Sequence, residues 1–361
     1  MFYYLADLKD VFFGFNVFKY ITFRAAMAGI TTFLLCLIFG PYFINKLRQM
    51  KIKEVAKRRD APTLDQFVES KEGTPTMGGI FVIGSILLSV LLWSDVMNVY
   101  IILTFVTCLY LAVLGFIDDY IKLTNPKKRG LSKRTKLIWE ILLGCFIGSY
   151  VYFNPNTPTS LDVPFLKSGA VYLGVFYIPF AALVVIGTSN AVNLTDGLDG
   201  LAIGCVMIVT MTLAVLSYMT GNLNFANYLL IPFINGTGEL TVFCGAMLGA
   251  SLGFLWFNCF PATVFMGDTG SLSLGGTLGV ISVLIKKELL LFLLGGIFVI
   301  ECVSVIMQVA SFKLTGKRIF KMAPFHHHLQ LSGWKESKII IRLWIVAIIL
   351  AILTLATLKI R

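Results

Sequence analysis

The sequence predicts an all-α integral membrane protein, a polytopic bundle of about ten transmembrane helices, and three observations support this prediction. Hydrophobic residues make up 57% of the 361 positions and charged residues only 14%. This balance leaves too little polar surface to cover the core of a water-soluble domain. The apolar residues lie in long runs, and most basic residues lie between them. We therefore expect residues 1–361 to form a single membrane domain.

The apolar runs define the individual spans. A transmembrane helix needs about 20 mostly apolar residues. The runs that approach this length are 20–44, 77–94, 99–117, 136–153, 173–189, 201–219, 240–257, 271–285, 289–311 and 339–358. An even number of spans places both termini on one side of the membrane.

The distribution of Lys and Arg predicts which side that is. Segments 45–75, 119–136 and 313–338 hold 21 of the 30 basic residues. Cytoplasmic loops retain positive charge, so these segments are expected in the cytoplasm, together with the connections 190–200 and 258–270. Both termini are then expected in the periplasm.

Composition also argues against several other classes of protein. The net charge of +11 comes from basic residues beside the spans, which favours anionic lipid and excludes a separable nucleic-acid-binding domain. The seven cysteines are scattered singly with no C-x-x-C pair, so they are expected to be core residues. No cleavable signal peptide is recognisable, and the first span is expected to direct insertion.

A row of glycines marks one helix face for close packing. Gly245, Gly249 and Gly253 recur every four residues, a pattern that lets a neighbouring helix approach closely. Packing inside the monomer is the favoured interpretation, and a homodimer interface is the alternative.

Polar residues that the topology assigns to the cytoplasmic mouth are the main pointers to function, because charges at membrane depth are costly. They fall in four stretches, GFIDDYIK with the basic segment after it, SNAVNLTDGLDG, WFNCFPATVFMGDTGS and APFHHHLQ. Their polar members are Asp118, Asp119, Lys122, Lys133, Asn190, Asn193, Asp196, Asp199, Asn258, Asp268, His326, His327 and His328. Their convergence on one face predicts a functional site.

The aspartate pair needs a compensating cation if it is more than a solvated helix end. Asp118 and Asp119 lie at the C-terminal end of a span, where the helix dipole disfavours negative charge. Lys122 or a metal ion could supply the positive charge. Neighbouring helical positions diverge by about 100°, so the two aspartates are expected to face different partners.

The other two Asn- and Asp-containing stretches allow both local and functional interpretations. Asn190, Asn193, Asp196 and Asp199 advance by three residues, which makes successive members neighbours on a helix or a tight turn, although turn chemistry alone could explain them. Asp268 or Ser271 could cap the helix that begins there, and Asp268 could instead bind a metal.

The mixture of side chains predicts magnesium and a phosphate substrate. Consecutive histidines on a helix cannot all face one ion, whereas carboxylates, amides and water suit Mg²⁺. Lysines and Mg²⁺ together neutralise phosphate. No phosphate-binding glycine loop is present, so side chains and metal must hold the phosphate. Glu301, deeper in its span, is expected to bond to another helix.

These motifs, together with KEGTPTMGG before the second span, resemble the phospho-N-acetylmuramoyl-pentapeptide transferases, the MraY translocases of the polyprenyl-phosphate N-acetylhexosamine-1-phosphate transferase superfamily. The resemblance extends over the full length. It implies transfer of phospho-MurNAc-pentapeptide from UDP-MurNAc-pentapeptide to undecaprenyl phosphate, giving lipid I and UMP. It also implies Mg²⁺ as cofactor and a bacterial cytoplasmic membrane with the active site on its cytoplasmic face.

The resemblance assigns roles to individual residues. It implies that Asp118 and Asp119 are the catalytic aspartate pair, that Asp268 is the principal Mg²⁺ ligand, and that all three border the metal. Lys122 and Lys133 are implied phosphate contacts. The remaining positions that it places around the substrate are Lys71, Thr76, Asn190, Asn193, Asp196, Asn258, Phe265, Gln308, His326, His327 and His328. Phe265 is suited to stacking on uracil.

The residues leave open both the route of the reaction and the substrate. Asp118 could act as general base in a single displacement or as nucleophile in a covalent two-step route. A transferase for UDP-GlcNAc or a related UDP-amino sugar is the alternative enzyme. An ion-coupled transporter is the alternative from another class, although transporters usually place charges near the midplane.

Overall fold

The computed structural model describes residues 1–50, 73–124, 130–155, 157–163 and 170–359. Its longer helices are α1 (Ile21–Gln49), α3 (Gly79–Trp93), α4 (Val99–Thr124), α5 (Lys133–Phe153), α6 (Tyr177–Thr195), α7 (Leu201–Thr220), α9 (Leu240–Asn258), α10 (Gly267–Leu284), α12 (Gly296–Thr315) and α14 (Glu336–Thr357). The shorter elements are η1 (Phe2–Leu8), η2 (Phe13–Lys19), β1 (Ser160–Asp162), β2 (Ala170–Tyr172), η5 (Gly174–Phe176), α8 (Leu223–Leu229), η6 (Thr237–Glu239), α11 (Glu288–Leu294) and α13 (Phe325–Gln330).

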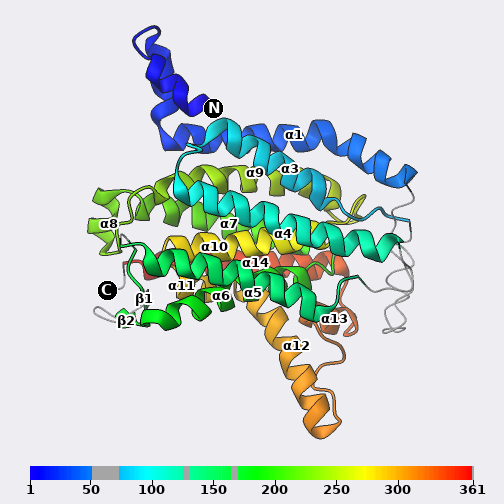
Figure 1. The fold of residues 1–361 in the computed structure, drawn as a ribbon. Coiled ribbons are helices and arrows are strands. Elements are labelled where there is room, and N and C mark those ends of the chain that lie inside the picture. The colour runs from blue at the N-terminus through cyan, green and yellow to red at the C-terminus, as the bar shows by residue number, and fades with distance from the viewer. Residues whose placement is uncertain (51–72, 125–129, 156, 164–169, 360–361) are drawn as a thin grey trace.

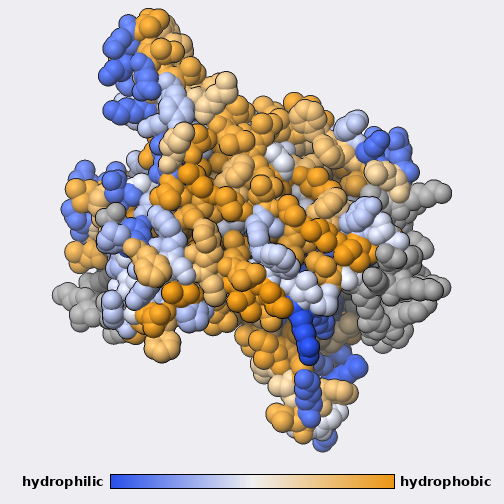
Figure 2. Space-filling model, in the orientation of Figure 1, coloured by the Kyte–Doolittle hydropathy of each residue, from blue (hydrophilic) through white to orange (hydrophobic). Residues whose placement is uncertain are grey.

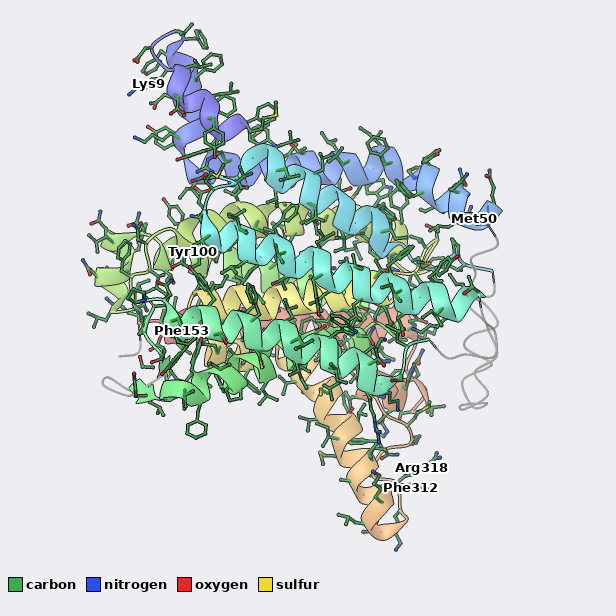
Figure 3. The ribbon with its side chains drawn as sticks, in the orientation of Figure 1. Lys9, Met50, Tyr100, Phe153, Phe312 and Arg318 are labelled. Atoms are coloured by element: carbon green, nitrogen blue, oxygen red, sulfur yellow. The ribbon has the colours of Figure 1, made fainter. Side chains whose placement is uncertain are left out.

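The long helices lie side by side, and the two chain termini lie at the same end of the bundle (Figure 1). Met50, at the end of α1, lies at the opposite end from Tyr100 and Phe153 (Figure 3). Helix α12 leaves the bundle at an angle, with Phe312 in its last turn and Arg318 just beyond its end at the tip. Hydrophobic side chains cover most of the visible flank (Figure 2), as expected for a surface in contact with lipid.

The all-α class and the membrane character are confirmed. Eight of the described helices are long and apolar enough to cross a membrane. Of the other two predicted spans, the one in α3 is apolar but has only 15 residues. The small antiparallel pair β1–β2 is the one sheet in the described residues, with Leu161 opposite Val171.

The second exception is the predicted span 271–285, which forms α10 and is less hydrophobic than the other spans for a physical reason. Every residue from Thr269 to Leu284 is buried, so this helix faces protein on all sides and needs no lipophilic surface. Its glycines allow close approach, and a methyl group on Gly79 or Gly115 would overlap its first turn. Its hydroxyls bond to neighbours, and Ser273 donates to the carbonyl oxygen of Cys108 at 2.6 Å.

Several span boundaries differ from the prediction because polar side chains at the helix ends find partners inside the bundle. Helix α4 continues past the aspartate pair to Thr124, and α6 continues past Asn190 and Asn193 to Thr195. The predicted span 289–311 is two helices, α11 and α12, which meet at Gly295.

The glycine row packs inside the monomer, as the favoured interpretation predicted. A methyl group on Gly245 would overlap the carbonyl oxygen of Ala25, and one on Gly249 would overlap that of Gly29. Gly253 faces Cys36 in the same way. Helix α1 therefore occupies this face of α9, so the row does not form a homodimer interface.

Substituting Gly249 with alanine is expected to destabilise the protein by about 1–3 kcal/mol, the usual cost of overpacking. The added methyl group would meet the backbone of α1, which cannot move aside as a flexible side chain can. Thermal unfolding of the purified protein measures the effect. Gly84→Ala is the control because no atom of a neighbouring segment lies within 4 Å of its added methyl group. Equal unfolding temperatures for the two variants would contradict the packing described here.

Candidate functional site

Three carboxylates from two helices meet at one end of the bundle. Asp118 and Asp119 lie on α4 and Asp268 lies in the first turn of α10, with ligand oxygens that are all within 4.8 Å of one another. Asp118 follows Val99 by 19 residues, which places the cluster roughly 30 Å along α4 from the end of the bundle that holds the termini. The predicted convergence of these three residues is confirmed.

Lys122 lies among the three carboxylates. Its Nζ atom is 2.6 Å from Asp118 Oδ2, 3.0 Å from Asp268 Oδ2 and 3.7 Å from Asp119 Oδ1. The cation that the aspartate pair requires is thus supplied in part by the same helix, one turn later. The Lys122 side chain is 41% exposed, which makes it the open edge of the cluster.

Lys136, on α5, is a second cation at the cluster. Its Nζ atom lies 2.9 Å from Asp118 Oδ2 and 2.5 Å from Asp268 Oδ2. Three carboxylates are therefore balanced by two ammonium groups. This imbalance leaves negative charge for a further cation.

The two adjacent aspartates have different partners, as their angular separation predicted. Asp118 Oδ1 accepts a hydrogen bond from the backbone N–H of Leu131 at 2.7 Å, which ties the start of α5 to α4. Its Oδ2 is buried and has close lysines but no partner in hydrogen-bond geometry among the described residues. One oxygen of Asp118 is therefore structural, and the other faces the site.

Asp119 caps helix α10 from outside that helix. It accepts from the backbone N–H of Asp268 at 3.2 Å and of Thr269 at 3.0 Å, and from the Thr269 hydroxyl at 2.9 Å. A carboxylate at a helix N-terminus satisfies otherwise unpaired donors and favours the dipole. The capping role considered for Asp268 or Ser271 thus belongs to Asp119, and Ser271 is already inside the helix.

The side chain of Asp268 is held in place by α6. Asn193 donates from Nδ2 to Asp268 Oδ1 at 2.9 Å and to the Ser271 hydroxyl at 2.8 Å. The other oxygen, Oδ2, faces the two lysines. Asn193 therefore orients the Asp268 carboxylate, and it lies beside the aspartates as the sequence predicted.

Two glycines allow the chain to pass close to the carboxylates. Gly130 and Gly267 have φ angles of +90° and +76°, a region that side-chain-bearing residues rarely adopt. A methyl group on Gly130 would contact Asp118 Oδ1, and one on Gly267 would contact Asp119 Oδ2. Glycine at these two turns therefore leaves room for the side chains of Asp118 and Asp119.

The cluster suits a hard divalent cation. Carboxylate oxygens are the ligands that Mg²⁺ and Ca²⁺ prefer, and the buried Oδ2 of Asp118 faces the centre of the cluster between Lys122 and Lys136. The one such group of acidic, His or Cys side chains found in the described residues is Asp118, Asp119 and Asp268.

Other residues predicted for the site contact the segments that carry the carboxylates and lysines. Asn190 donates to Glu140 Oε2 on α5 at 2.7 Å. Thr76 lies beside Gly267, and Phe265 pairs through its backbone with Pro75 and Gly78, at 2.8 Å each. Asp196 forms the C-cap of α6. The predicted residue Lys71 lies outside the described residues.

Asn258 is engaged with backbone groups. Its Oδ1 accepts from Gly200 N at 3.0 Å and its Nδ2 donates to the carbonyl oxygen of Val264 at 2.8 Å. Both ends of the amide therefore hold the loops that precede α7 and α10, which is a positioning role in this structure.

The histidine motif forms the short helix α13, and its three rings have different surroundings. His326 is fully buried against Gly197, with Nδ1 3.1 Å from Glu301 Oε2. His327 Nδ1 lies 2.8 Å from Gln330 Oε1. His328 Nδ1 accepts from the backbone N–H of Lys321. Through Gly197, the motif adjoins the loop that follows Asn193.

Two side chains of α12 hold this region. Glu301 Oε2 also accepts from the backbone N–H of His326 at 3.3 Å, so Glu301 bonds to another helix as expected. Gln308 accepts from the backbone N–H groups of Ile319 and Phe320 and donates to the Phe320 carbonyl oxygen. Gln308 therefore shapes the turn that leads to the histidines.

Replacing Glu301 with leucine is expected to destabilise the protein by about 1–3 kcal/mol, because the buried backbone N–H of His326 would lose its acceptor and the His326 ring would lose the carboxylate 3.1 Å from its Nδ1. Glu301→Gln retains an acceptor oxygen and should recover most of the stability. Thermal unfolding of the two purified variants provides the measurement. A leucine variant as stable as the glutamine variant would show that the Glu301–His326 contact does not hold α13 in place.

Sequence reasoning singled out Lys133, but the structure brings Lys136 to the carboxylates instead. The Lys133 side chain is exposed and makes no ion pair with them among the described residues. Glu140 was also missed. A signal was available, because Lys136, Glu140, Gly144 and Gly148 recur every four residues on one helix face. The two glycines of that row pack against α6, so this face of α5 points into the bundle and Lys136, at one end of the row, reaches the carboxylates.

Comparisons with known proteins agree with the geometry. Residues 100–286 match the Glycosyl transferase family 4 model, and residues 71–83 match phospho-N-acetylmuramoyl-pentapeptide-transferase signature 1. The phospho-N-acetylmuramoyl-pentapeptide-transferase of Desulforapulum autotrophicum is 50% identical over 100% of both chains. The protein of the same name from Thermodesulfovibrio yellowstonii is 52% identical over 99% of both chains.

Proposed function

Because the chain belongs to the phospho-N-acetylmuramoyl-pentapeptide transferase family, we propose that it transfers phospho-MurNAc-pentapeptide from UDP-MurNAc-pentapeptide to undecaprenyl phosphate. The products are lipid I and UMP, and the reaction is the first membrane step of bacterial peptidoglycan synthesis. The site faces the cytoplasm in this proposal, as the basic loops predict.

The observation that carries the proposal is the carboxylate and lysine cluster at one end of an apolar bundle. A reaction between a soluble anionic nucleotide and a lipid phosphate needs a site that both water and the bilayer can reach. Lys122 and Lys136 supply the positive charge that two phosphate groups require. Both are partly exposed, with side-chain exposures of 41% and 22%.

In the proposed reaction, an oxygen of undecaprenyl phosphate attacks the sugar-side phosphorus of the UDP-sugar. A P–O bond forms to the lipid, the P–O bond to the bridging oxygen breaks, and that oxygen leaves with UMP. Lys122 and Lys136 can exchange a carboxylate contact for a phosphate oxygen and so offset the charge that develops on the leaving group. Asn193 keeps Asp268 in orientation during this exchange.

Magnesium fits this chemistry. Asp268 and Asp118 would hold the ion, since each directs an oxygen toward the centre of the cluster. When bound, Mg²⁺ supplies charge neutralisation to the diphosphate. Asp119 borders the same centre, but its hydrogen bonds to the first turn of α10 support a positioning role.

Asp118 is the proposed base or nucleophile. Its Oδ2 is buried and lies between the ammonium groups of Lys122 and Lys136, at 2.6 and 2.9 Å, so it faces the groups that would contact the substrate phosphates. An acceptor phosphate is largely ionised near neutral pH, so a single displacement needs little help from a base. Trapping a radiolabelled enzyme from the UDP-sugar alone would identify the covalent alternative.

The substrate assignment is tested by offering the purified protein either UDP-MurNAc-pentapeptide or UDP-GlcNAc with undecaprenyl phosphate and Mg²⁺, and by measuring UMP release. We expect release with the muramoyl substrate that depends on the lipid acceptor. Release with UDP-GlcNAc alone would assign the chain to the alternative sugar. Uptake into liposomes without any UMP would indicate a transporter.

A further inference from the structure

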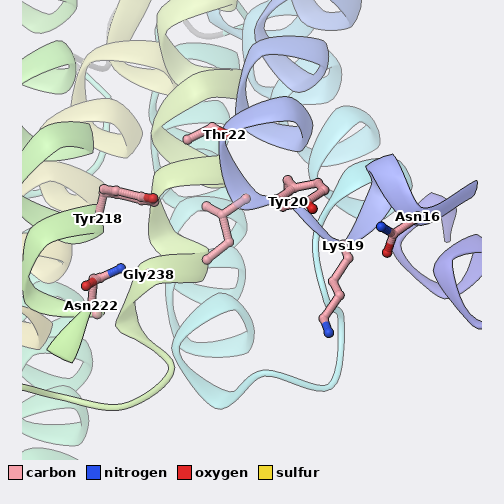
Figure 4. A pocket seen from close by; sticks show the side chains of 9 residues that line it. Asn16, Lys19, Tyr20, Thr22, Tyr218, Asn222 and Gly238 are labelled. Carbon is pink, nitrogen blue, oxygen red and sulfur yellow. The ribbon is translucent and has the colours of Figure 1, made fainter. Parts of the chain in front are cut away.

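A second polar hollow lies at the opposite end of the bundle from the carboxylates. It has a volume of about 400 Å³ and is bordered by η2, the start of α1, the end of α7 and η6 (Figure 4). The side chains that matter here are Asn16, Lys19, Tyr20, Thr22, Tyr218 and Asn222. Tyr218 and Asn222 point from one side toward the segment that carries Tyr20 on the other.

The hollow lies at a membrane surface. Three candidate spans begin or end around it, at Ile21, at Thr220 and at Thr237. Lys19 and Asn222 lie just beyond the ends of these spans. This is the depth at which lipid headgroups and interfacial tyrosines are found.

Most of the hydrogen-bonding side chains around the hollow have no partner among the described residues. The side chains of Asn16, Tyr20, Thr22 and Tyr218 make no hydrogen bond within the described residues, and Lys19 makes no ion pair there. Asn222 uses its Oδ1 to cap α8, accepting from Asn224 N and Phe225 N. Its Nδ2 is left to donate. One cation and several neutral donors therefore surround a common space.

The charge of the hollow is positive. None of the residues that line it is acidic. The carboxylate of Glu239, next in sequence to Gly238, is paired with both terminal nitrogens of Arg24, at 2.5 and 2.6 Å. Tyr20 caps α1 without a side-chain bond, so the first N–H groups of a 29-residue helix add partial positive charge. This environment favours an anion.

We propose that this hollow binds a phosphate group, with Lys19 as its charged contact and the surrounding amides and hydroxyls as neutral donors. Exposed apolar side chains beside it favour a phospholipid as the source. Tyr20, Leu223 and Phe225 are 58%, 53% and 44% exposed, and they would contact the acyl chains. The site is separate from the carboxylate cluster and does not depend on the function proposed for that cluster.

The test is a binding titration of the full-length protein in a neutral detergent, followed by thermal unfolding. The ligands are a short-chain phosphatidylglycerol and inorganic phosphate, with a short-chain diacylglycerol as the lipid without phosphate. Lys19→Gln is expected to bind phosphatidylglycerol about fivefold more weakly, the size expected for one lysine at an anionic membrane surface. Tyr218→Phe, which removes only a hydroxyl, should weaken binding by a smaller factor.

The matched control is Lys9→Gln, which removes an exposed lysine outside the lining of the hollow. Protection by phosphatidylglycerol that Lys9→Gln retains and Lys19→Gln loses would support a lipid headgroup site. Protection by inorganic phosphate alone would support the anion site but assign it to a soluble ligand. Equal responses of the two lysine variants to every ligand, or equal protection by diacylglycerol, would overturn the proposal.

Discussion

Asp268→Asn is expected to lower UMP release about 10³-fold or more while the protein still inserts and folds. The substitution keeps the size of the side chain and the possibility of a hydrogen bond with Asn193, but it removes the charge that faces Lys122 and Lys136. It also removes the proposed metal ligand. The measurement is UMP release at saturating substrates over a range of Mg²⁺ concentrations.

Asp10→Asn is the control for this experiment, since Asp10 is an exposed carboxylate in the N-terminal segment. Its turnover should equal that of the wild type. An Asp268→Asn enzyme that keeps more than about a tenth of wild-type turnover at ordinary Mg²⁺ would remove Asp268 from the metal site. Loss of both activity and thermal stability would show instead that the carboxylate holds the fold.

Lys136→Met is expected to reduce kcat/KM for UMP release about 10²-fold, the usual size of the loss when one charge-stabilising donor is removed. Methionine retains most of the aliphatic length of lysine, so the packing of α5 is preserved. The ammonium group between Asp118 and Asp268 is lost. Steady-state kinetics with each substrate varied in turn will show whether the loss falls on kcat or on KM.

Lys133→Met provides a matched comparison on the same helix, one turn earlier. Because its side chain is exposed, we expect kcat/KM within about twofold of wild type, the range of ordinary surface substitutions. If Lys133→Met were the impaired variant and Lys136→Met were active, the assignment of the phosphate-binding lysine would be reversed.

The sequence was sufficient for the class of fold and for the position of the carboxylates. Apolar runs predict helices because lipid requires internally satisfied backbone groups, and charges at the ends of those runs predict a site because they are costly elsewhere. The family inferred from the motifs was confirmed by relatives about 50% identical over the whole chain. The divergence of Asp118 and Asp119 followed from helical geometry alone.

Features that depend on contacts between segments far apart in the chain could not be predicted from the sequence pattern. The choice between Lys133 and Lys136 depends on how α5 rotates against α6. The four-residue spacing of Lys136, Gly144 and Gly148 shows that they share a helix face, but only the contacts of the two glycines with α6 show that this face points into the bundle. The capping of α10 by Asp119 joins residues about 150 positions apart. The break at Gly295 likewise separates two helices within one apolar run.

The glycine- and serine-rich composition of α10 has a consequence for how the protein is made. A segment with such weak affinity for hydrocarbon has little reason to leave the translocation channel on its own. Its partners α4 and α6, which pack along it, are synthesised earlier and can receive it as a preassembled protein surface. We therefore expect the helix that carries Asp268 to insert stably only when α4 and α6 are already in place to receive it.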